Sequence, residues 1–228
     1  MIAAATMFGV TYGLSAPLIA LDLAQRGFDE TLIGLNAAMH AVGVLVVAPA
    51  LPRLAARFGQ RPVIVIALLA SAGLMALFPL VALTLLWFPL RAALGAASEA
   101  LFTLTETWTN ELSPEDARGR IMATYTAALS LGYAAGPALL AWLGSGDQAY
   151  FAGAALALVA VLPLLWWHLR VPPQEDAPQL ALLRSLRLAP LGMAATLLNA
   201  AVETSGLSFI TLYATNMGWS EIAGMHLI

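Results

Sequence analysis

The chain has 228 residues, of which 61% are hydrophobic and only 10% are charged, and its formal net charge is −3. An ordinary soluble domain is about 45–50% apolar and about 25% charged, so this composition predicts an integral membrane protein. All ten basic residues are arginine and cysteine is absent, which excludes Schiff-base lysines, Walker-type phosphate loops, disulfide scaffolds and cysteine-bound metals. No basic tract is present, so nucleic-acid binding is not expected.

A helix that crosses a bilayer needs about 20 mostly apolar residues. Apolar runs separated by short polar connections predict spans over 2–24, 32–54, 62–83, 85–108, 120–143, 148–169 and 188–215. A secretory signal peptide is the alternative for the first run, but no positive side chain precedes its apolar stretch. The pattern therefore predicts an all-α membrane protein.

An internal echo indicates how these spans are organised. Gly13-Leu14-Ser15 recurs as Gly206-Leu207-Ser208, so the seventh span resembles the first; chance similarity is the alternative. Secondary transporters are commonly built from repeated halves. We expect a six-helix bundle over 1–169, a cytoplasmic linker over 170–187 with a short interfacial helix at 179–188, and the start of a second bundle over 188–228. A complete transporter would then require the missing C-terminal half.

The arginines predict the orientation. If the helices alternate, one face carries every loop arginine except Arg26, namely Arg53, Arg57, Arg61, Arg118, Arg120, Arg170, Arg184 and Arg187. Positive charge is retained in the cytoplasm, so we expect a cytoplasmic N-terminus in an inner or plasma membrane. The tryptophans fall near span ends and predict an aromatic belt: Trp87, Trp108, Trp142, Trp166, Trp167 and Trp219.

Three motifs resemble those of the major facilitator superfamily. Residues 91–97 resemble its RxxxGxxA motif, and residues 132–137 resemble the GxxxGP motif of its drug:proton antiporter branch. Residues 56–61 resemble the DRxGRR loop, although Ala56 replaces the acidic residue, Pro52 a glycine and Gln60 an arginine. The resemblance implies the N-terminal bundle and helix seven of a transporter.

Two of these motifs are candidates for a role in conformational change. The resemblance implies a gating role for Arg57, Gly59 and Arg61, with anchoring at the inner surface as the alternative for the two arginines. Gly132 and Gly136 share a helix face that permits close packing, and Pro137 removes a backbone donor and favours a kink. This stretch is either a hinge for alternating access or a static packing seam.

Charged residues inside the predicted spans indicate the transport site, because such charges face a partner or a water-filled cavity. Arg91, Glu99 and Glu106 fall within about 80° on one face of span four, together with Gly95, Ser98, Thr105 and Thr109. Glu99 is near mid-span, and we interpret it as a proton-coupling or cation-binding group tuned by Arg91. A structural polar role is the alternative for Glu99, and snorkelling is the alternative for Arg91 and Glu106.

Two further spans carry polar residues at helical spacing. Asn36, His40 and Gly43 share a face of span two, and Asn199, Glu203 and Gly206 share a face of span seven. We expect Asn36, His40, Asn199 and Glu203 to line the substrate cavity, with helix packing as the alternative for His40.

The expected function is secondary active transport of a small molecule by alternating access, with proton-coupled efflux as the leading form. Proton-coupled uptake and a non-transporting membrane scaffold are the alternatives. An enzyme is not expected, because the histidines, His40, His168 and His226, do not form a His-Glu-x-x-His pattern. ATP-driven transport is not expected either, because no nucleotide-binding signature is present. The expected partners are the substrate, protons and the lipid bilayer, and no cofactor or metal is expected.

Overall fold

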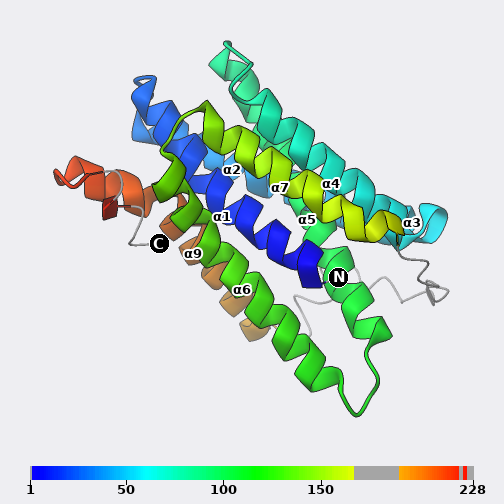
Figure 1. The fold of residues 1–228 in the computed structure, drawn as a ribbon. Helices are drawn as coiled ribbons and strands as arrows, with labels where there is room; N and C mark the ends of the chain where they lie inside the picture. The colour runs from blue at the N-terminus through cyan, green and yellow to red at the C-terminus, as the bar shows by residue number, and fades with distance from the viewer. Residues whose placement is uncertain (1, 167–189, 221–222, 225–228) are drawn as a thin grey trace.

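The computed structural model describes residues 2–166, 190–220 and 223–224, apart from several side chains in the last long helix. The described elements are helical throughout (Figure 1). In chain order they are α1 (Ile2–Gln25), α2 (Glu30–Val47), η1 (Ala48–Ala50), α3 (Leu51–Phe58), α4 (Gln60–Leu77), η2 (Thr84–Leu86), α5 (Trp87–Leu112), α6 (Arg118–Leu143), α7 (Asp147–Trp166) and α9 (Pro190–Asn216).

The predicted spans correspond to these long helices, and the all-α fold is confirmed. Among the described residues, six helices are long and apolar enough to cross a membrane, from α1 to α7 with α2, η1 and α3 counted as one. The predicted span at 62–83 ends early, because α4 stops at Leu77 just before Pro79, which cannot donate to a continuing helix. The predicted linker at 170–187 lies outside the described residues.

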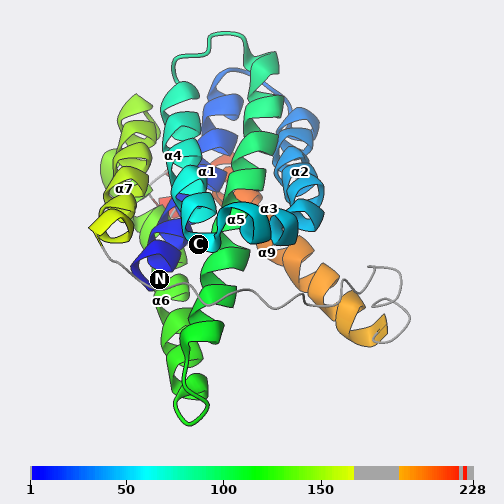
Figure 2. The same cartoon turned by 90° about the vertical axis from the view of Figure 1, so that its right-hand side faces the viewer.

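Helix α3 is short, and its sequence fits the surface of a bilayer. Leu51 and Ala55 are buried, whereas Arg53, Ala56 and Arg57 are exposed on its other side. The helix lies across the direction of the long helices rather than along it (Figure 2). An apolar face on the bundle with arginines on the other side is the pattern of an interfacial helix.

Helix α1 forms the centre of the bundle and packs against α6, α7 and α5 (Figure 1). Its crossing with α6 has no side chain between the two backbones. A Cβ added at Gly9 would lie 2.6 Å from the Leu129 carbonyl oxygen, and one added at Gly136 would lie 2.5 Å from the Gly13 carbonyl carbon. Paired small-xxx-small faces on both helices therefore permit this close contact.

The second close crossing joins α2 to α5. A Cβ at Gly43 would meet the Ala92 carbonyl oxygen, and one at Gly95 would meet the carbonyl oxygen of His40. Since Gly95 follows Arg91 by one helical turn, this crossing brings the polar face of α2 beside Arg91. The two glycine crossings thus fix where the polar residues of three helices meet.

Aromatic packing closes the end of the bundle formed by the α1–α2 and α4–α5 connections. Trp87 packs edge-on against Phe78 at 5.2 Å and contacts Tyr150 at 6.3 Å between ring centroids. Arg26 lies 4.4 Å over the Trp87 ring, and its Nε donates to Asp22 at 2.9 Å. This cluster ties α1, α5 and α7 together.

The predicted aromatic belt is therefore partly wrong. Trp87 and Trp108 are fully buried inside the bundle, whereas Trp142 and Trp219 are 81% and 53% exposed. The side chains of Trp166 and Trp167 lie outside the described part of the structure. Position along a helix indicates depth in the membrane, but not which side of the helix the ring occupies.

Candidate transport site

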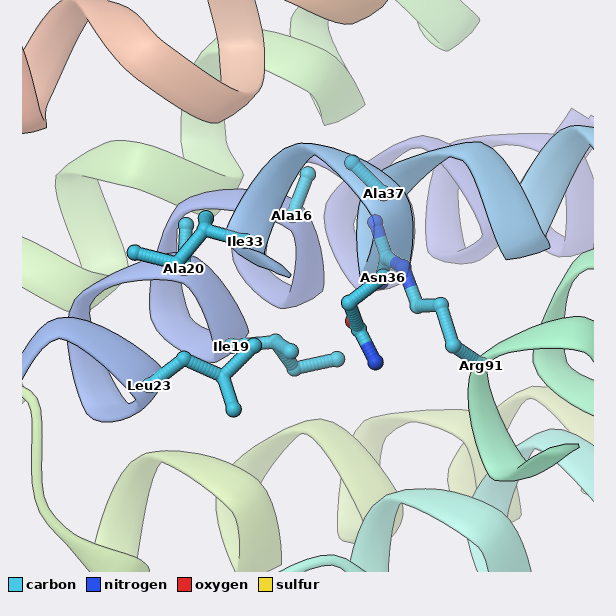
Figure 3. A pocket seen from close by; sticks show the side chains of 8 residues that line it. All are labelled: Ala16, Ile19, Ala20, Leu23, Ile33, Asn36, Ala37 and Arg91. Carbon is cyan, nitrogen blue, oxygen red and sulfur yellow. The ribbon is translucent and has the colours of Figure 1, made fainter. Parts of the chain in front are cut away.

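The polar groups of α1, α2 and α5 meet around Arg91. Its side chain is 2% exposed, and it extends from α5 toward Asn36 and Ala37 of α2 (Figure 3). Within the described residues, Nε and Nη1 of Arg91 have no hydrogen-bond partner, and Arg91 forms no ion pair. A buried guanidinium of this kind is costly in a membrane, and Arg91 is therefore the centre of the candidate site.

Other buried polar atoms beside Arg91 are also unpaired. Nδ2 of Asn36 and Nδ1 of His40 have no hydrogen-bond partner among the described residues, although both side chains are buried. The His40 ring lies edge-on to Tyr12 of α1, with 5.1 Å between ring centroids. Asn36, His40 and Arg91, which the sequence places on two separate spans, are therefore brought together.

A small void lies against these groups. Its volume is about 10 Å³, roughly what one water molecule needs. It is enclosed by α1, α2 and α5 (Figure 3), and its lining residues are Ala16, Ile19, Ala20, Leu23, Ile33, Asn36, Ala37 and Arg91. The void therefore combines an apolar wall with amide and guanidinium donors.

Glu99 and Glu106 lie apart from this cluster. Glu99 is half-buried and accepts a hydrogen bond of 2.6 Å from the Thr103 hydroxyl. Glu106 lines a hollow of about 400 Å³ that also includes Thr103, Asn110 and, on α6, Met122. The residues predicted to share one face of α5 therefore have different surroundings, because Arg91 is buried in the bundle whereas Glu106 lines an open hollow.

Thr105 in the C-terminal half of α5 contacts Tyr125 of α6. The Thr105 hydroxyl lies 3.0 Å from the hydroxyl of Tyr125, and both side chains are buried. Within α5, the Thr109 hydroxyl donates to the backbone carbonyl of Thr105 at 2.6 Å. Both hydroxyls are therefore satisfied, and the contact between Thr105 and Tyr125 joins α5 to α6.

Arg57, Gly59 and Arg61 lie in the connection from α3 to α4, as predicted, but in the described residues this connection forms no ion pair that would close a gate. Gly59 has φ +86°, which only glycine adopts readily and which turns the chain from α3 into α4. Arg57 is exposed, and Arg61 donates to the Leu165 carbonyl of α7 at 2.9 Å. Among the described residues, neither arginine contacts a carboxylate.

Gln60, which in the sequence is only a departure from the motif, makes the contact across this loop. Its side chain is buried, and its Nε2 donates to Oε2 of Glu111 on α5 at 3.0 Å. An arginine and a glutamine both present N–H donors, and this shared property is the signal that would have identified it.

The remaining predicted residues fall in two groups. Gly132, Gly136 and Pro137 are buried in the α1–α6 crossing, within an unbroken helix α6. The side chains of Asn199 and Glu203 lie outside the described part of the structure, although the backbone of α9 continues through both positions. In the described residues, no group of three or more histidines or acidic side chains is placed to hold a metal ion.

Comparison with known proteins agrees with this architecture. The sequence model of the Major Facilitator Superfamily matches residues 1–228, which is the whole chain. The chain belongs to this superfamily. Members of the superfamily move small molecules across membranes, so the chain is a multi-pass membrane protein of a transporter family.

Two matches illustrate the relationship to other members of the superfamily. An uncharacterized MFS-type transporter, YfkF of Bacillus subtilis (strain 168), is 30% identical over 131 residues, which are 57% of this chain and 33% of YfkF. The crystal structure of a D-xylose-proton symporter superposes with a TM-score of 0.69 at 16% identity, covering 98% of this chain and 63% of the symporter. The chain thus spans less than two thirds of either protein.

Proposed function

We propose that this chain is the substrate-binding first half of a proton-coupled secondary transporter that exports a small molecule. Membership of the superfamily supports transport, and the buried, unpaired Arg91 beside Asn36 and His40 supports a polar site between the helices. The GxxxGP motif at 132–137 supports export, because it resembles that of the drug:proton antiporters. Arg91 carries the proposal.

Glu99 is the group proposed to carry the proton. Glu99 is half-buried, lies about two helical turns from Arg91 and accepts a hydrogen bond from Thr103, which lines the hollow at Glu106. Only the Thr103 hydroxyl bonds to it among the described residues, so it has no cationic partner that would hold it permanently charged. A carboxyl group in that setting is able to exchange its proton as access alternates.

Proton-coupled uptake is the second candidate. The solved protein with the same fold is a sugar–proton symporter, whereas the sequence motif favours antiport. Antiport and symport differ in the direction in which the substrate moves relative to the protons, and this direction is measurable. An antiporter moves its substrate against the direction of proton entry, and a symporter moves it with the protons.

The proposal is tested in proteoliposomes under an imposed pH gradient, with the full-length transporter of which this chain is proposed to be the first half. Three labelled compounds represent the charge classes: benzoate, ethidium and D-xylose. We expect the gradient to drive at least one of them beyond its movement in protein-free liposomes, into which benzoic acid diffuses passively, and the sign of this protein-dependent movement distinguishes export from uptake. If none moves beyond the protein-free level, proton-coupled transport of these substrate classes is contradicted.

The compound that moves then tests Glu99. We expect Glu99→Gln to lower gradient-driven accumulation by about tenfold or more while downhill exchange persists, because only the coupling free energy is removed. Glu115→Gln is the matched control, since Glu115 is exposed in the α5–α6 connection. Unchanged accumulation by Glu99→Gln would show that another group carries the proton.

A further inference from the structure

The unpaired atoms at Arg91 and Asn36 share one property. Nε and Nη1 of Arg91 and Nδ2 of Asn36 are all hydrogen-bond donors, and none has an acceptor among the described residues. The guanidinium adds a positive charge that no described carboxylate neutralises. The chemical complement of this cluster is therefore an anionic acceptor rather than a cation or a neutral donor.

A second hollow shares the lining residue Ala37 with the void at Arg91. Its volume is about 310 Å³, and it lies between α2 and α9, lined by Gly34, Ala37, Ala38, Ala41, Ala201, Ser205 and Phe209. Almost all of these side chains are apolar and small, and the Phe209 ring closes on Gly34, where an added Cβ would lie 3.4 Å from its Cζ. A flat apolar group matches such a groove.

Ala37 connects the two spaces. It lines both the void at Arg91 and the groove between α2 and α9, and Asn36 is its neighbour in the chain (Figure 3). The side chain at this shared wall is a single methyl group. The void is about the size needed for one water, so it accommodates one oxygen atom of a head group whose body occupies the groove.

We infer that the substrate is a small amphipathic carboxylate, such as an aromatic acid. Its apolar body lies in the groove between α2 and α9, and its carboxylate accepts hydrogen bonds from Arg91 and Asn36. This inference rests on the proposed transport function and adds the substrate class to it. The charge is the selective feature, because a neutral analogue of the same shape leaves the guanidinium unpaired.

Binding is measured on the same full-length transporter in detergent, without any gradient, by the shift in Tm and by equilibrium binding of labelled benzoate. We expect benzoate to raise Tm by about 2–4 °C and benzamide, its neutral isostere, to leave it unchanged. A shift with benzamide equal to that with benzoate, or no shift with either, would overturn the inference.

Variants separate the head-group site from the groove. We expect Arg91→Gln and Ala41→Leu, which fills the groove, each to abolish benzoate binding. Arg118→Gln and Ala127→Leu are the matched controls, because both positions are exposed on α6 and line neither space. If Arg91→Gln fails to give a cooperative unfolding transition, two other single variants test the inference. We expect Arg91→Lys to weaken benzoate binding and Ala41→Leu to abolish it.

Two further arms identify other anion sources. Chloride that shifts Tm as benzoate does, without sensitivity to Ala41→Leu, would overturn the inference in favour of an inorganic ion. Benzoate binding that appears only in Glu203→Gln would overturn it in favour of a carboxylate of the chain itself. Ethidium or D-xylose moved by the pH gradient with no benzoate binding would leave proton-coupled transport standing and remove only the substrate class.

Discussion

A buried charge that lacks a partner costs stability, so Arg91 is expected to lower the free energy of unfolding of the ligand-free protein. Its guanidinium is 2% exposed, with two nitrogens unpaired among the described residues. Replacing a buried ion pair by apolar side chains of similar volume is often neutral or stabilising by about 1–4 kcal/mol, and a buried charge without a partner lacks even the Coulombic attraction of a pair. A ligand that binds and leaves during transport, as proposed above, would supply the partner that this charge lacks in the ligand-free protein.

Arg91→Met is accordingly expected to stabilise the ligand-free protein while removing transport. The gain is about 1 kcal/mol or more, measured as a rise in the midpoint of thermal unfolding in detergent. Arg118→Met on the exposed start of α6 serves as the control, and we expect its unfolding midpoint to stay unchanged. A large loss of stability in Arg91→Met would mean that the guanidinium has a permanent partner in the chain.

The closest helix crossings are at glycines, where the missing side chains let two backbones approach each other. The sequence predicts the spans, but it does not predict which helices pair at these glycines. Apolar runs locate the spans because a bilayer fixes their length. The glycine spacing at 132 and 136 indicates a close contact, but it does not say that Gly9 and Gly13 of α1 form the other side. Pairing is a three-dimensional property, so the sequence alone leaves it open.

The same limitation applies to the site. Charge inside a span singles out Arg91 and Glu99, and helical spacing singles out Asn36 and His40. Only the crossing of Gly95 on the His40 backbone shows that Arg91 belongs with the α2 residues and not with Glu99. Gln60 was missed as a contact because its partner, Glu111, lies 51 residues away in sequence.

The α1–α6 crossing gives a prediction at this scale. Gly136→Ala is expected to destabilise the protein by about 1–3 kcal/mol, because the new Cβ would lie 2.5 Å from the Gly13 backbone and force the helices apart. Gly73→Ala is the matched control, since nothing lies within 4 Å of its added Cβ. Alanine there is expected to stabilise α4 by about 0.5–1 kcal/mol, the ordinary helix preference over glycine.

Both variants are compared by thermal unfolding in the same detergent. Equal effects of Gly136→Ala and Gly73→Ala would show that the crossing is loose enough to accommodate a methyl group. In that case, the hinge interpretation of residues 132–137 would gain support over the packing seam.

At the scale of the whole molecule, the charged side chains are distributed unevenly between the two ends of the bundle. The end at the α3–α4 and α5–α6 connections carries the exposed arginines, including Arg53, Arg57, Arg118 and Arg120. The opposite end carries Arg26, which is already paired with Asp22 and stacked on Trp87. The exposed arginines that have no ion pair among the described residues are therefore concentrated at one end of the bundle. Because arginine-rich loops are retained in the cytoplasm, this distribution supports a cytoplasmic N-terminus.

The absence of cysteine from the sequence makes this orientation directly testable. Single cysteines introduced as Ala56→Cys on α3 and Gly146→Cys in the α6–α7 connection lie at opposite ends of the bundle, and each replaces an exposed residue. With a membrane-impermeant maleimide added to intact cells, we expect labelling at position 146 and none at 56, because the positive-inside rule places the arginine-rich loops in the cytoplasm. Inverted vesicles should give the opposite pattern, and permeabilised cells should label both, which controls for reactivity. Labelling of position 56 from outside would reverse the topology, and the arginines of α3 would then require a different explanation from retention in the cytoplasm.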